Sequence, residues 1–89
     1  MACRVAAQGA LDILMPHLDH TVQVSDDAVA AAMHHLFTDT HNVAEGAGAA
    51  ALAAALQERG QLQGQVVGLA LTGGNVDASV LAQVLTRQV

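Results

Sequence analysis

Apolar residues recur at helical spacing in four segments, which predict helices over residues 9–18, 26–38, 45–59 and from residue 77 onward. The clearest is the second, because Ser25 precedes it as an N-terminal cap and two aspartates occupy its first turn, where the helix dipole favours carboxylates. The alanine-rich third segment is apolar on nearly every side, which predicts a helix buried all round. Gly60 is expected to end this helix.

Two further segments have the patterns of strands. Residues 21–24 alternate and are rich in β-branched side chains, and residues 66–71 form a continuous apolar run that is typical of a parallel strand covered on both faces. The order of strands and helices predicts an α/β fold, in which ligands collect at the carboxyl ends of strands. No repeat or domain boundary is visible, so residues 1–89 are expected to form a single unit.

The composition indicates that this chain shares its surface with a partner. The hydrophobic fraction is 53% and the charged fraction 12%, whereas a soluble monomer carries about a quarter charged residues. The formal charge of -5 and the absence of lysine argue against nucleic-acid binding, which needs clustered basic residues. No apolar run is long enough to span a membrane and no leader pattern is present; together with a lone cysteine, Cys3, this predicts a cytoplasmic setting.

The turn over residues 72–75 is the strongest candidate for a ligand site. Gly73 and Gly74 would let a ligand approach the backbone, and Thr72 and Asn75 offer neutral hydrogen-bonding groups. Asp77 would repel an anion at the start of the next helix, so the turn suits a flat, neutral heterocycle better than a phosphate. The alternative is an ordinary strand-to-helix turn without a ligand.

Glu45 is a second candidate, because it directly precedes the alanine-rich helix. Its carboxylate could contact a cofactor or could cap the open amides of that helix. Gly46 and Gly48 in the first turn suggest close contact with another backbone or a ligand. The five histidines do not complete a metal-ligand set, and no base neighbours Cys3, so neither a metal site nor a cysteine nucleophile is expected.

Several blocks of residues resemble one family. They are MACRV at residues 1–5, VSDDAVAAAM at 24–33, EGAGAAAL at 45–52 and LTGGNVD at 71–77. In order and spacing they are similar to fold-type II pyridoxal-phosphate enzymes, and among these to the serine/threonine dehydratases, also called threonine ammonia-lyases. The resemblance implies a partial three-layer α/β sheet, the C-terminal segment of the large catalytic domain.

The resemblance also implies roles for individual residues. Thr72, where the family usually has serine, would face the pyridine nitrogen of the cofactor, and Gly73 and Gly74 would admit the ring. Glu45 and Asn75 would support the pocket, although the family often has proline where Gly46 stands in this chain. The family's Schiff-base lysine and phosphate-binding loop belong to other segments, and this chain contains no lysine at all.

The expected function is therefore that of a C-terminal fragment of a threonine or serine dehydratase, which forms a 2-oxo acid and ammonia. The fragment itself should carry no catalytic residues and bind pyridoxal phosphate weakly or not at all. Its expected partners are the remainder of the catalytic domain or a second copy bound through apolar faces, and the parent's substrate is an amino acid. The alternatives are a stand-alone, non-catalytic association module and the remnant of a decayed lyase gene; a serine racemase or another fold-type II lyase is a lesser variant.

Overall fold

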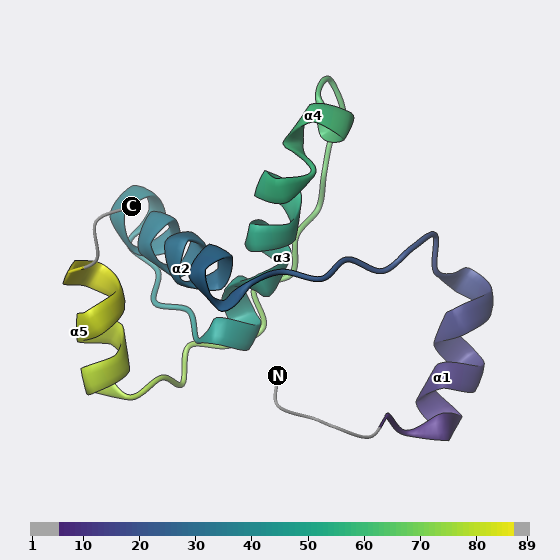
Figure 1. Cartoon of the computed structure of the whole chain (residues 1–89), viewed down its shortest axis with the longest axis horizontal. Helices are drawn as coiled ribbons and strands as arrows, with labels where there is room; N and C mark the ends of the chain where they lie inside the picture. Colours follow the sequence, from purple (N-terminus) through teal and green to yellow (C-terminus); the bar gives the residue numbers. More distant parts are fainter. Residues whose placement is uncertain (1–5, 87–89) are drawn as a thin grey trace.

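The computed structural model of the chain describes residues 6–86. Over these residues it contains five α-helices, one short 3-10 helix and no strand (Figure 1). None of these helices is long and apolar enough to cross a membrane. The elements, in chain order, are α1 Gln8–Leu14, the 3-10 helix η1 Met15–His17, α2 Asp26–Thr40, α3 Gly46–Gln57, α4 Arg59–Leu62 and α5 Ala78–Thr86.

The prediction of an α/β sheet is wrong for the described part of the chain. Both segments with strand patterns, residues 21–24 and 66–71, lack regular secondary structure and run beside helices (Figure 1). The second was expected to be covered on both faces, yet Val66 is fully exposed and Leu69 and Leu71 are nearly half exposed. A strand forms only where a neighbouring backbone completes its hydrogen-bond ladder, and among residues 6–86 no segment does so.

The start of α2 follows the prediction closely. The Ser25 hydroxyl accepts a hydrogen bond from the amide of Ala28 at 3.1 Å, and Asp26 and Asp27 fill the first turn. The helix continues two residues beyond the expected end at residue 38 and stops where His41 adopts a left-handed conformation with φ of 59°. The cap and the apolar spacing act within one segment, which is why the pattern alone identified this helix.

Two predictions about the alanine-rich segment are wrong. α3 ends at Gln57, and Gly60 lies inside the short helix α4 instead of terminating α3. Only three α3 residues, Gly48, Ala49 and Ala53, are buried, so the helix is not covered on all sides. Among the other described helices it packs against α2 and α4 alone, which leaves the rest of its apolar surface half-buried or exposed.

The core lies between α2 and α3, and α5 packs against α2 from another side. Its side chains are mostly small, and Met33 is the longest of them, with 4% of its surface exposed. By contrast, α1 contacts no helix except the adjoining η1 and stands apart from the others in Figure 1. The buried core residues are Val29, Ala30, Ala32, Met33, Ala44, Ala49, Ala53 and Val84.

The chain exposes much more surface than a compact protein of its size. Its accessible area is 6719 Å², whereas a compact monomer of 9.1 kDa exposes about 4,900 Å². The radius of gyration is 14.3 Å, against roughly 12 Å for a compact domain of this length. Apolar side chains account for part of this surface, including Ile13, Met15 and Val66. The arrangement therefore leaves large apolar side chains exposed to solvent.

Shortening Met33 is expected to destabilise the fold strongly. Met33→Ala removes the longest side chain from the core and should lower the free energy of unfolding by about 2–5 kcal/mol. Met15→Ala is the matched control, because Met15 is 61% exposed and its loss should change stability by less than about 0.5 kcal/mol. Urea unfolding followed by far-UV circular dichroism measures both. Equal midpoints for the two variants would contradict this location of the core.

Candidate functional site

The turn over residues 72–75 lies against the start of α3. The backbone amide of Glu45, the residue that precedes α3, donates a hydrogen bond to the carbonyl oxygen of Gly73 at 3.0 Å. Two of the segments that the sequence analysis singled out are thus adjacent, although they are far apart along the chain. The bond positions the turn on the N-terminal end of a helix that the α2 packing holds in place.

Glycines allow this approach of the two backbones. A Cβ atom at Gly48 would collide with the carbonyl oxygen of Gly73 and would come within 3.1 Å of its nitrogen. A Cβ at Gly74 would lie 2.5 Å from the carbonyl oxygen of Val43. The close contact predicted at Gly48 is therefore confirmed, and the structure shows that another backbone makes it. Gly46 differs, because a Cβ atom there would lie 3.6 Å from Cγ1 of Val29, which is an ordinary van der Waals distance.

The carboxylate of Glu45 does not cap α3, so the capping interpretation is wrong. The residue is half-buried, and its Oε1 lies 2.6 Å from the position that a Cβ on Gly73 would take. Glu45 and Asn75 line one pocket of about 470 Å³ together with Asp77. Two carboxylates and an amide therefore meet at this pocket, while Val76 and Val80 provide its apolar wall.

Thr72 lies at the surface, outside the residues that line this pocket. Thr72 directly precedes Gly73, whose backbone lies against both Glu45 and Gly48. The structure brings four of the five predicted residues into direct neighbourhood around the start of α3 and leaves Thr72 facing solvent. The two carboxylates at this pocket would repel an anion.

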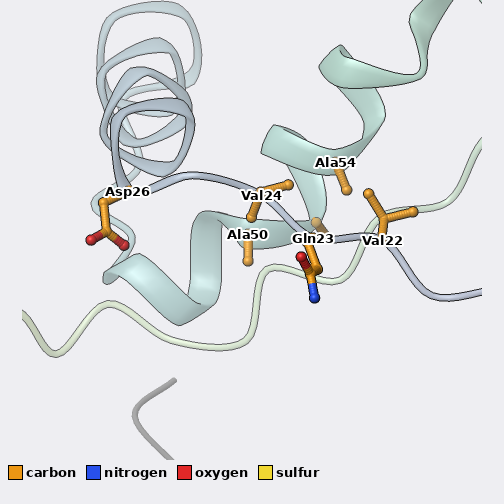
Figure 2. Close-up of a pocket in the computed structure, with 7 residues that line it drawn as sticks. Val22, Gln23, Val24, Asp26, Ala50 and Ala54 are labelled. Carbon is orange, nitrogen blue, oxygen red and sulfur yellow. The ribbon is translucent and has the colours of Figure 1, made fainter.

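A larger pocket of about 660 Å³ contains none of the predicted site residues. It lies where residues 22–24 cross α3, between Val22, Ala50 and Ala54 (Figure 2). Its lining residues are apolar except for Gln23 and Asp26. Sequence analysis did not identify this pocket, because nothing in the pattern shows that the segment crosses the alanine face of α3.

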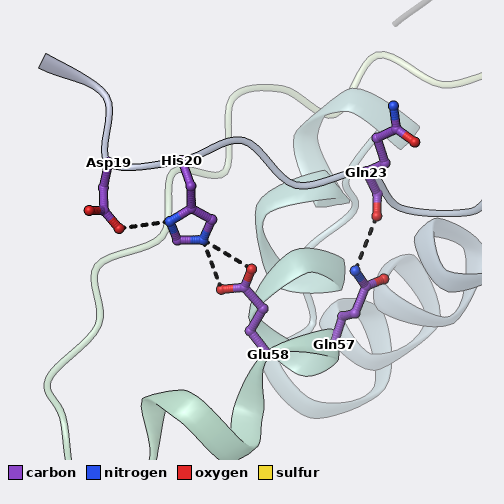
Figure 3. A network of polar contacts seen from close by, with 5 residues as sticks. All are labelled: Asp19, His20, Gln23, Gln57 and Glu58. Carbon is purple, nitrogen blue, oxygen red and sulfur yellow. Dashed lines mark hydrogen bonds and ion pairs between the residues drawn. The ribbon is translucent and has the colours of Figure 1, made fainter. Parts of the chain in front are cut away.

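A second polar cluster joins the same segment to the end of α3 (Figure 3). The His20 ring lies between the carboxylates of Asp19 and Glu58. The sequence analysis considered His20 only as a metal ligand, and within residues 6–86 no group of three or more His, Cys, Asp or Glu side chains is arranged to hold a metal ion. Glu58 is 38 residues away, so no local signal could have indicated the contact. Cys3 and the block at residues 1–5 lie outside the described residues.

Comparison with known proteins gives one family and two relatives. The family described as "Pyridoxal-phosphate dependent enzyme" matches residues 1–73. The L-threonine ammonia-lyase of Thermotoga maritima is 29% identical over 76 residues, which are 85% of this chain and 19% of that protein. A protein of Sinorhizobium fredii named "Putative threonine dehydratase" is 34% identical over 68 residues, 76% of this chain and 20% of that protein. The chain thus spans about a fifth of the length of these curated relatives, and no solved structure matches it significantly.

A methyl group at Gly48 is expected to force the turn away from α3. Gly48→Ala should lower the free energy of unfolding by about 1–3 kcal/mol, because the new Cβ overlaps backbone atoms of Gly73 that no side-chain rotation can move. Gly60→Ala is the control: Gly60 is also helical but has open space around it, so alanine should be neutral or stabilise by up to about 1 kcal/mol. Chemical denaturation measures both. A neutral Gly48→Ala would contradict the contact.

Proposed function

The chain belongs to the family of pyridoxal-phosphate dependent enzymes, and on this premise we propose that it supplies one wall of the cofactor site of a threonine or serine dehydratase. The proposed reaction removes water from the amino acid and deaminates it, which yields a 2-oxo acid and ammonia. The names of the two relatives support this substrate class. The observation that carries the proposal is the contact of the Thr72–Asn75 turn with the start of α3, through Glu45 and Gly73.

The residues at this turn fit the ring of the cofactor better than its phosphate. Thr72 is exposed and its hydroxyl is neutral, so the hydroxyl would face the ring nitrogen without forcing a proton onto it. Gly73 and Gly74 leave the backbone without side chains beside the ring, and Glu45 and Asn75 would support its edge. The carboxylates of Glu45 and Asp77 would repel a phosphate. The phosphate would therefore be held by residues other than residues 6–86 of this chain. When bound, pyridoxal phosphate supplies the electron sink for loss of the α-proton and the β-hydroxyl.

A complete site also requires groups that this chain does not contain. Its only basic side chains besides histidine are three arginines. The amine that binds the cofactor covalently must therefore come from residues outside this sequence. We propose that the remainder of the catalytic domain supplies them and covers the exposed apolar surface, with a second copy as the alternative partner. The accessible area of 6719 Å² supports this, because its excess over a compact monomer is larger than the roughly 800 Å² that each partner buries in a standard interface.

A cofactor analogue should contact the turn through Thr72. Pyridoxine 5′-phosphate, which lacks the reactive aldehyde, is titrated into the isotope-labelled chain at millimolar concentration and amide shifts are followed by NMR. Shifts are expected at Glu45 and at residues 72–75. Thr72→Ser should retain them because the hydroxyl remains, whereas Thr72→Val should reduce them at least about twofold, since one hydrogen bond is worth about 1 kcal/mol.

Thr86→Val is the matched control for this titration. The Thr86 hydroxyl donates to the carbonyl oxygen of Ala82 within α5 at 2.9 Å, away from the turn, so its removal should leave the amide shifts unchanged. Shifts that appear elsewhere on the chain, or that are equal in Thr72→Val and the unmodified protein, would contradict the proposed position of the ring.

The chain by itself should not produce the 2-oxo acid. Incubated with pyridoxal phosphate and L-threonine, it is expected to form no 2-oxo acid above a protein-free control, because an enzyme of this family needs an amine side chain and the sequence contains no lysine. A dehydrogenase-coupled assay measures the product. Product that increases in proportion to protein concentration would contradict the conclusion that essential groups lie on other residues.

A further inference from the structure

The contact between His20 and Glu58 joins two parts of the chain that have few other connections. His20 lies on the segment of residues 18–24 that leads from α1 and η1 to α2, and Glu58 lies at the junction of α3 and α4. Because α1 contacts only η1, the position of the N-terminal helices depends on this segment. Figure 3 shows the segment held at two points, at His20 and at Gln23.

Both nitrogens of the His20 ring face carboxylates. Nδ1 lies 2.7 Å from Oδ2 of Asp19, and Nε2 lies 3.1 and 3.3 Å from the two oxygens of Glu58. An ionised carboxylate can only accept hydrogen bonds, and a neutral imidazole has a single N–H to donate. The observed geometry is therefore fully hydrogen-bonded only when the ring carries both protons and a positive charge.

We propose that His20 is a proton-dependent clasp, which in its charged form ties residues 18–22 to the α3–α4 junction and in its neutral form releases them. The neutral ring keeps one N–H and retains the shorter contact with its neighbour Asp19. Its Nε2 lone pair then faces the Glu58 carboxylate, and two acceptors repel each other. Release at Glu58 frees η1 and α1, since they contact no other helix.

The surrounding charges set the direction of the pH dependence. The hydrogen bond to Asp19, then that to Glu58, and then the attraction of both carboxylates raise the pKa of His20 above its ordinary value, and only desolvation opposes them. Arg59 follows Glu58, but its guanidinium donates to the carbonyl oxygen of Leu56. With a raised folded-state pKa, the contact is complete below the ordinary histidine pKa and is lost as the pH rises through the raised value.

The second contact that holds the segment, between Gln57 and Gln23, has no titratable group. The Gln57 side-chain amide donates to the carbonyl oxygen of Gln23 at 3.1 Å, and Val24 packs against the core. The segment should therefore open only on the N-terminal side of Gln23. Residues 23–25 then serve as an internal reference, because they remain attached at every pH at which the core is folded.

NMR relaxation of the full chain tests the clasp. Backbone order parameters of residues 19–22 are measured at about pH 5.5, below the ordinary histidine pKa of about 6.5, and at about pH 8.5. They are expected to fall from about 0.85 to below about 0.6 as the pH rises, while those of residues 23–25 stay constant. Equal order at the two pH values in residues 19–22 would overturn the proposal.

Two variants separate the clasp from general pH effects. Glu58→Gln replaces the carboxylate by an amide, which can accept from the charged ring and donate to the neutral one, so residues 19–22 should lose their pH dependence, although Asp19 still raises the pKa of His20. His17→Gln removes another exposed histidine, in η1, and should preserve the pH dependence. If Glu58→Gln keeps the pH dependence, or His17→Gln abolishes it, His20 is not the clasp.

Discussion

The packing of α2 on α3 through small side chains supports every other feature of this molecule. Ala32 on α2 and Ala49 on α3 are completely buried, and their size lets the two helices lie close together. Small side chains remove little apolar area from water, so the stability of this pair depends on the few longer residues beside them, above all Met33. Helices α4 and α5 attach to this pair and contribute little core of their own, whereas α1 contacts only η1.

The two ends of α3 carry different chemistry. At its start, the absence of side chains at Gly48 and Gly73 lets a turn approach the helix backbone, and a hydrogen bond from Glu45 holds that turn. At its end, the half-buried Glu58 and the exposed Gln57 hold the segment that leads to α2 through their polar side chains. The proposed wall of the cofactor site lies at the start of α3, and the proposed His20 clasp lies at its end. A disturbance of the α2–α3 core would therefore affect both.

The apolar run at residues 66–71 explains why pattern and structure disagree. Its sequence is that of a buried segment, yet in the chain by itself Val66 and its neighbours are exposed beside α3. Contiguous exposed apolar surface is typical of interaction sites. The chain belongs to the family of pyridoxal-phosphate dependent enzymes and spans about a fifth of the length of its curated relatives. The exposed run supports the proposal that the remainder of a catalytic domain covers this surface.

From the sequence by itself, the features that depend on neighbouring residues could be determined. These are the capped helix α2 and the position of α5. The sequence also indicated the family and a close approach at Gly48, but not that the distant backbone of Gly73 makes this approach. Tertiary structure alone decided that no strand forms in residues 6–86, that the Glu45 carboxylate leaves α3 uncapped, and that His20 meets Glu58. The physical reason is the distance between partners: a cap and an apolar stripe lie within one segment, whereas a strand ladder or an ion pair needs a partner that only the folded chain brings near.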